Sequence, residues 1–360
     1  MHSAVAAVLP LCLHRWCLMP ETNQRLLVVS PAWVGDMVMA QTLYKLLKQR
    51  RPSMAIDVLA PPATLALVTR MPEVDQAIEF NVGHGQLQWN YRKASAKGLK
   101  SAGYQQAIVL PNSLKSALVP WLADIPLRTG FRGEYRFGLI NDMRLLDKKR
   151  LPRMIDRFVA LGVPVNAPQP QITYPQLKVD LANQAQLLEK LGLQQTGHIL
   201  GLCPGAEFGD AKRWPAEHYA RVAEMALNQG MQVWIFGGPG DQAIAQQITA
   251  AIAGDPAGQI RDLTGKTALL DVIDLLPLCH LVLSNDSGLM HIAAAVGCAT
   301  AVVYGSTSPA FTPPLTDKVH MLSHPLPCSP CFKRTCPLGH KNCLNQLLPE
   351  QLSTIVSQYA

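Results

Sequence analysis

Apolar and polar positions along the first half of the chain alternate between short buried runs and longer amphipathic stretches. The short apolar runs predict strands, and apolar residues at helical spacing between them predict helices. The predicted strands are Arg25–Ser30, Ala55–Leu59, Gln76–Phe80 and Gln106–Leu110. The predicted helices are Met37–Arg50, Ala63–Arg70 and Tyr91–Gly103. This alternation of strand and helix indicates a parallel sheet that is covered by helices.

The same alternation restarts after a stretch with four prolines at 162–180, where we place a domain boundary. The strands predicted beyond it are His198–Cys203, Met231–Phe236, Leu281–Ser284 and Ala299–Tyr304. We therefore expect an α/β fold with two Rossmann-like, doubly wound parallel-sheet domains that face each other across a cleft. They would comprise residues 25–175 and 176–345, followed by a C-terminal helix at 346–360.

The overall composition excludes a disordered chain, because 48% of the 360 residues are hydrophobic and 16% are charged. No apolar stretch is long enough to span a membrane. Residues 1–24 are predicted to be an N-terminal extension outside the fold, with Met19 as an alternative start. The apolar run in this extension lacks the flanks of a signal peptide. Nine cysteines without such a signal predict reduced thiols in a cytoplasmic protein.

The turn after the first predicted strand ends in a carboxylate. Pro31 and Gly35 interrupt the apolar run, and Asp36 follows directly before the predicted helix. The carboxyl ends of parallel strands are where open α/β sheets carry out chemistry. The turn lacks the glycine-rich fingerprint that binds a pyrophosphate, so we expect Asp36 to act as a base.

Three strand-end turns in the second half predict a binding site for an anionic ligand. Lys212 stands just before a helix, where a cation and backbone N–H groups together can meet a phosphate; the alternative is an ordinary surface loop. The turn Ser284–His291 groups polar side chains at a helix start, as a ligand site or as structural caps. Its candidate donor-binding residues are Asp286, Ser287, Gly288 and His291.

In the third of these turns, Asp241 beside Gly238 would accept from ribose hydroxyls or cap a helix. Thr267 belongs to a segment similar to a phosphate-binding P-loop, but Ile260 stands where that motif needs glycine. We therefore reject a P-loop, but we expect the turn Thr264–Thr267 to line the cleft, with Thr267 as a candidate donor-binding residue.

Polar and basic residues after the strand Gln106–Leu110 predict an acceptor site on the same rim as Asp36. The candidates are Asn112, Ser113, Lys115, Arg128, Arg132 and Arg136, the arginines as bidentate clamps for acidic groups. Between 128 and 157 nine basic residues face four acidic ones, within a formal net charge of +7. This surplus indicates a phosphorylated ligand, an acidic membrane surface or nucleic acid, although no nucleic-acid-binding motif accompanies it. The alternative is a solvated basic face.

A second group of candidates consists of four cysteines near the C-terminus, Cys328, Cys331, Cys336 and Cys343. The C-x2-C start suits zinc, but the later spacing is not that of a standard finger. The interpretations are a structural metal site and a cluster of reduced thiols. We assign no metal to catalysis.

The chain resembles the ADP-heptose:lipopolysaccharide heptosyltransferases, a family of GT-B glycosyltransferases. The resemblance runs from about Arg25 to the C-terminus. It rests on Val34-Gly35-Asp36, on the segment 211–215, and on Asn285-Asp286-Ser287-Gly288 with His291. The segments 110–117 and 128–133 are similar to the heptosyltransferase II branch in particular.

The resemblance implies that the C-terminal domain binds ADP-L-glycero-D-manno-heptose and that the N-terminal domain binds Kdo-lipid A carrying one heptose. It implies an enzyme at the cytoplasmic face of the inner membrane, without a required cofactor and without a nucleic-acid partner. Asp36 would be the base of an inverting transfer, and Lys212 would stabilise the departing diphosphate.

The alternatives are heptosyltransferase I or III, another lipopolysaccharide core sugar transferase, and a non-catalytic membrane-surface binding protein. An oxidoreductase or epimerase would need a glycine fingerprint that neither domain has.

Overall fold

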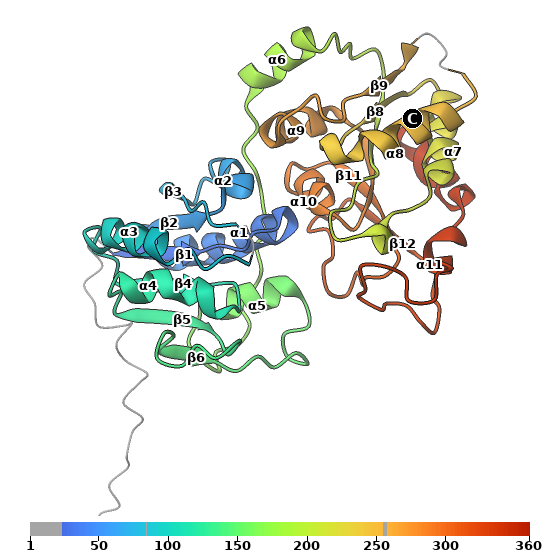
Figure 1. Ribbon diagram of the computed structural model, residues 1–360. Helices are drawn as coiled ribbons and strands as arrows, with labels where there is room; N and C mark the ends of the chain where they lie inside the picture. Colours follow the sequence, from blue (N-terminus) through green and yellow to red (C-terminus); the bar gives the residue numbers. More distant parts are fainter. Residues whose placement is uncertain (1–23, 84, 255–257) are drawn as a thin grey trace, which may run out of the picture.

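The computed structural model describes residues 24–83, 85–254 and 258–360 and contains two parallel sheets (Figure 1). The strand order is β3-β2-β1-β4-β5-β6 in the first sheet and β12-β11-β10-β7-β8-β9 in the second. In both sheets the first strand is central and the chain winds outward on one side before it crosses to the other. The predicted pair of doubly wound, Rossmann-like domains is therefore confirmed. The N-terminal extension lies outside the described residues, except Gln24.

The first sheet belongs to the N-terminal lobe. Its strands are β1 (Arg25–Val29), β2 (Ala55–Ala60), β3 (Gln76–Glu79), β4 (Gln106–Val109), β5 (Leu127–Phe131) and β6 (Asp142–Arg144). Its helices are α1 (Val34–Arg50), α2 (Pro62–Val68), α3 (Trp89–Lys100), α4 (Leu118–Leu122) and α5 (Met154–Ala160), with a 3-10 turn η1 (Leu114–Ala117).

The second sheet belongs to the C-terminal lobe. Its strands are β7 (Ile199–Cys203), β8 (Gln232–Ile235), β9 (Ile260–Asp262), β10 (Leu281–Asn285), β11 (Ala299–Tyr304) and β12 (Val319–Ser323). The helices are α6 (Leu181–Lys190), α7 (Ala216–Leu227), α8 (Gln242–Ala251), α9 (Leu269–Leu275), α10 (Gly288–Ala295), α11 (Asn342–Asn345) and α12 (Ser353–Tyr359). The 3-10 turns are η2 (Asp210–Lys212), η3 (Pro239–Asp241), η5 (Leu276–Leu278) and η6 (Pro349–Leu352), and the predicted C-terminal helix consists of η6 followed by α12.

The central strands of both sheets are buried on both faces, as continuous apolar runs in parallel sheets are. Helix α1 covers one face of the first sheet and buries Met37, Leu43 and Leu47 against it. It begins at Val34, three residues before the predicted start, because the N–H of Met37 already bonds the carbonyl of Trp33 at 2.9 Å. Asp36 therefore lies in the first turn of α1.

The chain passes from the first lobe to the second through residues 161–180, which contact both lobes. The Gln41 side chain on α1 makes two hydrogen bonds to the main chain of Gln176. Its Nε2 donates to the carbonyl of Gln176 at 2.8 Å, and its Oε1 accepts from the N–H of Gln176 at 2.9 Å. Further along, the N–H of Leu177 bonds the carbonyl of Ala295 at 3.0 Å. The linker is thus fastened to α1 on one side and to the end of α10 on the other.

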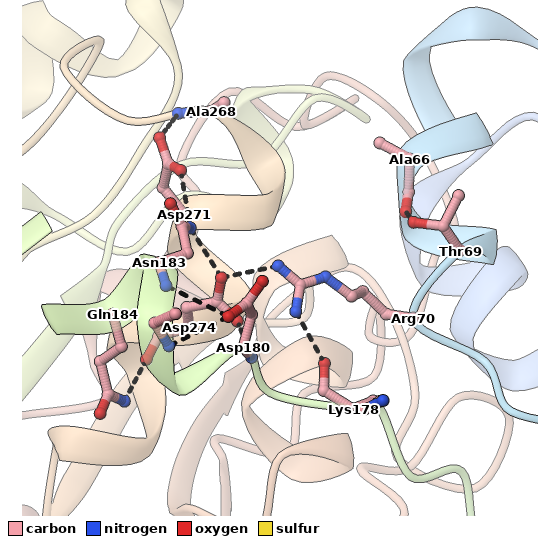
Figure 2. Close-up of polar contacts among 11 residues, drawn as sticks. Ala66, Thr69, Arg70, Lys178, Asp180, Asn183, Gln184, Ala268, Asp271 and Asp274 are labelled. Carbon is pink, nitrogen blue, oxygen red and sulfur yellow. Dashed lines mark hydrogen bonds and ion pairs between the residues drawn. The ribbon is translucent and has the colours of Figure 1, made fainter. Parts of the chain in front are cut away.

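Asp274, a buried carboxylate on α9, accepts hydrogen bonds from both lobes and from the linker (Figure 2). Asp274 accepts from the guanidinium of Arg70 at 2.7 Å, across the two lobes. It also accepts from the N–H of Asp180 and the side chain of Asn183, both at 2.8 Å. Arg70 in turn bonds the carbonyl of Lys178 at 3.2 Å. One carboxylate therefore joins the N-terminal lobe, the linker and the C-terminal lobe.

Candidate active site

Asp36 lies where the two lobes meet, and its surroundings change its acidity. Burial raises the pKa of Asp36, the charge of Lys212 lowers it and the charge of Asp286 raises it, and together they bring the pKa from 3.8 to about 6. Asp286 and Lys212 belong to the second lobe, so the structure brings the three predicted residues within electrostatic range of one another. The result is a partly exposed carboxylate that titrates close to neutral pH.

Two glycines allow the N-termini of α1 and α10 to touch. A Cβ on Gly35 would lie 2.7 Å from Cδ2 of His291, and a Cβ on Gly288 would lie 2.8 Å from Cβ of Val34. Contacts this short do not occur between real side chains, so both positions need glycine for this approach. Because a helix N-terminus carries partial positive charge, the contact brings two such ends together next to Asp36.

Lys212 is held in place by the loop that follows β10. Its Nζ donates to Oδ2 of Asp286 at 2.8 Å and to the carbonyl of the same residue at 3.0 Å. It also lies 5.1 Å from the ring centre of Phe208. An ammonium group has three N–H donors, so these two bonds leave one for a ligand.

Asn285 was not among the predicted site residues, and it fixes the loop that carries Lys212. Its buried amide accepts from the N–H of Trp214 at 3.0 Å and donates to the carbonyl of Pro204 at 2.6 Å. Thr312 was also missed; its hydroxyl lies 3.4 Å from Oδ1 of Asp286. Asn285 stands inside the motif that signalled the site, whereas no sequence pattern marks Thr312.

His291 is a buried, uncharged imidazole in this arrangement. Burial lowers its pKa from 6.5 to about 4, which the charge of Lys212 favours and that of Asp286 opposes. Within the described part of the chain, its Nδ1 has no hydrogen-bond partner. A neutral imidazole has one donor and one acceptor nitrogen, so His291 keeps hydrogen-bonding capacity next to the lobe contact.

Ser287 occupies the N-cap position of α10, but its side chain does not cap the helix. Its hydroxyl instead lies 3.3 Å from that of Ser284 on β10. Capping by Ser287, which belongs to the alternative interpretation of this turn as structural caps, is therefore not observed. The first N–H groups of α10 donate no hydrogen bond to this hydroxyl, which suits an anionic ligand.

Of the two predicted roles of Asp241, the cap of the helix that follows it is not formed, because its side chain makes no hydrogen bond to the start of α8. Its Oδ2 accepts from the N–H of Gly238 at 3.0 Å, and a Cβ on Gly205 would lie 2.5 Å from the carboxylate. This carboxylate therefore lies against the backbone at the ends of β7 and β8. Thr267, in the next turn, places its hydroxyl 3.5 Å from the carbonyl of Leu263.

Arg136 is fully buried and holds two loops of the N-terminal lobe together. Its guanidinium donates to the carbonyl of Pro111 at 2.7 Å, to that of Phe131 at 2.5 Å and to Oδ1 of Asn112 at 3.2 Å. These acceptors lie after β4 and at the end of β5. The predicted acceptor contact by Arg136 is therefore wrong, because its guanidinium faces main-chain oxygens and not the surface.

Arg128 is also engaged within its own lobe. It donates to the carbonyls of Ile125 and Leu139, each at 2.6 Å, and stands at the start of β5, away from the strand end that faces Asp36. The structure thus speaks against the predicted clamp by Arg128. Arg132 differs, because it follows β5, is exposed, and makes no side-chain hydrogen bond or ion pair with any described residue.

The three polar candidates after β4 have mixed environments. Asn112 is exposed, although its amide oxygen bonds Arg136. The hydroxyl of Ser113 caps η1 by accepting from the N–H of Ser116 at 3.3 Å. The Lys115 side chain bonds the carbonyl of Gly85. Of these, Asn112 has the side chain most available to a ligand.

The four C-terminal cysteines have free thiols and are partly exposed. Burial and the charges of the other three raise the pKa of Cys343, so the four lie near one another. Among the residues that the structure describes, no group of three or more His, Cys, Asp or Glu is placed to hold a metal ion. The structural metal stays a prediction.

Comparison with known proteins agrees with this geometry. Residues 92–342 match glycosyltransferase family 9 (heptosyltransferase). Lipopolysaccharide heptosyltransferase 2 of Salmonella typhimurium is 44% identical over 305 residues, which cover 83% of this chain and 87% of that protein. For lipooligosaccharide heptosyltransferase 2 of Haemophilus influenzae the identity is 45% over 305 residues, with coverage of 82% and 88%.

Among solved structures, ADP-heptose lps heptosyltransferase II of E. coli superposes with a TM-score of 0.82 and 38% identity. The superposition covers 93% of this chain and 99% of that one. Sequence and fold therefore agree over nearly the same range. The chain belongs to glycosyltransferase family 9, the heptosyltransferases, and is a glycosyltransferase.

Proposed function

We propose that the protein transfers L-glycero-D-manno-heptose from ADP-heptose to the first heptose of the lipopolysaccharide inner core, with inversion at the anomeric carbon. The observation that carries this proposal is the position of Asp36 on one lobe beside Lys212 and Asp286 on the other. A base and a cationic phosphate site then meet at one point. The names of the relatives, heptosyltransferase 2, supply the sugar and the acceptor.

In this mechanism Asp36 accepts the proton of the acceptor hydroxyl while that oxygen bonds to the anomeric carbon. The bond between this carbon and the diphosphate oxygen breaks at the same time, and ADP leaves with the electron pair. A general base works best when its pKa lies close to the working pH. With a pKa of about 6, Asp36 is ionised at neutral pH and is a stronger base than an ordinary aspartate.

The departing diphosphate gains negative charge, which the second lobe stabilises. The third N–H of Lys212 and the N-terminus of α10, which starts at Gly288, supply fixed positive charge there. His291 adds a neutral hydrogen-bonding group beside the same helix. These groups are in place before the reaction, so little rearrangement opposes it.

We assign the nucleoside of the donor to the ends of β7 and β8. There Asp241 uses Oδ2 for the N–H of Gly238, which leaves Oδ1 for a ribose hydroxyl. Thr267 lies in the turn after β9 and would line the same end. The acceptor is assigned to the first lobe, with Arg132, Asn112 and Lys115 near its charged groups.

The acceptor that fits the basic segment is Kdo-lipid A carrying one heptose, a membrane lipid with an anionic head. None of the described helices is both long enough and apolar enough to cross a bilayer. We therefore propose that the enzyme meets this lipid from the cytoplasmic face of the inner membrane, as a peripheral protein.

The test is incubation with ADP-heptose and core lipids of defined heptose content, read by mass spectrometry. We expect the mass of one added heptose on the acceptor that already carries one. Core lipids with no heptose and with two serve as controls for the reactions that add a first or a third heptose. Transfer to another of these acceptors would overturn the acceptor assignment, and no acceptor-dependent release of ADP would overturn the transferase proposal.

A further inference from the structure

Large apolar side chains are exposed on the two loops that follow β5 and β6. Tyr135 is 88% exposed, Leu145 70% and Phe137 68%. The N–H of Arg132 bonds the carbonyl of Arg144 at 2.7 Å, so the two loops leave the sheet side by side. Scattered exposed apolar residues are common, but large ones gathered at one edge of a domain indicate an interaction site.

The same two loops carry basic side chains without acidic partners. Arg132, Lys148, Lys149 and Arg150 are exposed, and none of them forms an ion pair with a described residue. We call these four, with Tyr135, Phe137 and Leu145, the edge surface. It thus combines apolar rings and chains with unpaired positive charge.

The acidic residues of this region are held by partners within the lobe. Asp142 pairs with Arg144 at 2.7 Å, and Asp156 pairs with Arg153 at 2.8 Å. Asp147 accepts from the N–H groups of Lys149 and Arg150 at 2.9 and 3.2 Å, and Glu134 accepts from the N–H of Leu114 at 2.8 Å. Main-chain N–H groups do not cancel the charges of Asp147 and Glu134, so the four basic side chains Arg132, Lys148, Lys149 and Arg150 face two acidic ones outside ion pairs, and the surplus is positive.

The edge surface lies next to the junction of the lobes. β6 is the outermost strand of the first sheet, and the chain runs from it through the basic loop into α5 (Figure 1). At the start of α5 the N–H of Met154 bonds the carbonyl of Phe311 in the second lobe at 3.0 Å. The guanidinium of Arg157 lies 4.7 Å from the ring centre of Phe311. A partner bound to the edge surface would therefore stand beside the junction.

We propose that the edge surface docks on an anionic lipid bilayer, with Tyr135, Phe137 and Leu145 in the headgroup region and the four cations against lipid phosphates. Aromatic side chains favour this interface, and each nearby lysine or arginine adds to the attraction of an anionic leaflet. A second copy of the chain fits less well, because two such surfaces would repel each other. The inference rests on the proposed function, in which the acceptor is itself a membrane lipid.

The test is co-sedimentation of the full chain with vesicles of phosphatidylcholine alone or mixed with phosphatidylglycerol, without donor or acceptor. Two double variants of the edge surface test its two kinds of side chain separately. Lys148→Glu with Lys149→Glu reverses positive charge, and Tyr135→Ser with Leu145→Ser removes large apolar side chains. The matched controls are Lys97→Glu with Lys190→Glu, and Leu181→Ser, all at exposed positions outside the edge surface.

We expect binding to the mixed vesicles only, a loss of about tenfold or more in each edge variant, and no loss in the controls. Equal binding of the edge variants and the wild type would overturn the proposal, as would equal binding to neutral vesicles. Self-association that only the edge variants lose, without vesicle binding, would assign the surface to a second copy. Because no sugar is transferred in this assay, its outcome is independent of whether the proposed reaction is correct.

Transfer assays then connect the docking to the reaction. With a lipid acceptor in vesicles, the edge variants should raise KM, whereas with a delipidated core oligosaccharide they should match the wild type. A merely structural role would lower the rate on both acceptors. Loss on the oligosaccharide alone would also contradict docking.

Discussion

Gly35 of the first lobe and His291 of the second lie in direct contact, with no room for a methyl group between them. A Cβ on Gly35 would stand 2.7 Å from Cδ2 of the imidazole. Glycine at this position thus sets how closely α1 approaches α10, and with that the distance between Asp36 and the Lys212–Asp286 pair.

Gly35→Ala should therefore lower the rate of transfer at least tenfold, because the methyl group would force the two lobes apart. Steady-state kinetics measure the loss, and combining the change with His291→Ala tests its cause. If the clash is responsible, the two substitutions will be non-additive, with the alanine at 291 making room for the one at 35. Gly98→Ala is the control, because a Cβ at Gly98 meets nothing within 4 Å. Full activity of Gly35→Ala would show that this contact does not limit catalysis.

Asp36→Asn should reduce kcat by roughly 10²–10⁴-fold, because it removes the base and keeps the shape. For the wild type, kcat/KM should rise with pH through about 6 and level off above it, as Asp36 loses its proton. The pH profile of the asparagine variant should lack this rise. Wild-type turnover by the variant, or a profile that keeps the rise, would refute the base assignment.

The same substitution should stabilise the fold at neutral pH. A carboxyl group whose pKa is raised by folding destabilises the folded state once it is ionised, so the cost is full above about 6 and absent below 3.8. The difference between these two pKa values corresponds to an upper limit of roughly 3 kcal/mol. Urea unfolding should thus show Asp36→Asn more stable than the wild type at pH ~8, with the gap closing as the pH falls towards the lower value. A gap independent of pH would contradict burial as the cause.

Lys212→Met should weaken the binding of ADP by about tenfold or more, because it removes the cation and keeps an apolar chain of similar length. Titration calorimetry with ADP measures the change. The variant also leaves the buried carboxylate of Asp286 without its cationic partner and with only the hydroxyl of Thr312 nearby, which by itself destabilises the protein. Lys212→Met combined with Asp286→Asn separates the two effects. Lys190→Met, at an exposed lysine far along α6, should bind ADP as the wild type does; unchanged affinity in Lys212→Met would argue against the phosphate role.

Arg136 and Arg132 have the same side chain and opposite expected effects. Arg136→Met should destabilise the fold by about 1–3 kcal/mol, because it removes the guanidinium donor to the buried carbonyl of Phe131 and leaves that of Pro111 with only the hydroxyl of Ser116. Arg132→Ala should leave stability within about 0.5 kcal/mol and raise KM for the anionic acceptor. Chemical denaturation and acceptor kinetics make the comparison. If Arg136→Met were as stable as the wild type, or if Arg132→Ala were unstable and left KM unchanged, the structural role of Arg136 and the acceptor role of Arg132 would be contradicted.

This pair shows why the sequence predicts some parts of the site and not others. The order of predicted strands and helices along the chain places Asp36 and Lys212 after the ends of strands. The carboxyl ends of the strands of a parallel sheet lie along one edge, where such residues form a site. No local pattern distinguishes an arginine that clamps a ligand from one that bonds main-chain carbonyls. For Arg136 the answer depends on where the loop after β4 meets the end of β5, which is a tertiary relationship.

Tertiary relationships that no local pattern reveals also decide which strands could be predicted. Strands buried on both faces, such as Ala299–Tyr304, are continuous apolar runs, and this one was predicted to the residue. The outer strands Asp142–Arg144 and Ile260–Asp262 have three residues each, are only partly buried and contain charged side chains. Their extended form comes from pairing with β5 and β8, and periodicity does not reveal it.

The contact between Arg70 and Asp274 should govern how the lobes are held relative to each other. The carboxylate is fully buried and also accepts from Asp180 of the linker and from Asn183 of α6, so Arg70→Met leaves it with donors from only one lobe and the linker (Figure 2). We expect the variant to lose about 1–3 kcal/mol of unfolding free energy and to show faster proteolysis in the linker 161–180.

The double-mutant cycle of Arg70→Met and Asp274→Asn isolates the contact between the lobes. A coupling energy of about 1 kcal/mol or more is expected, because the two groups bond directly at 2.7 Å. Lys100→Met with Asp124→Asn provides the control cycle, since that pair is exposed and joins residues of a single lobe. If the buried pair couples no more strongly than the exposed one, or if linker proteolysis is unchanged, this carboxylate does not fasten the lobes.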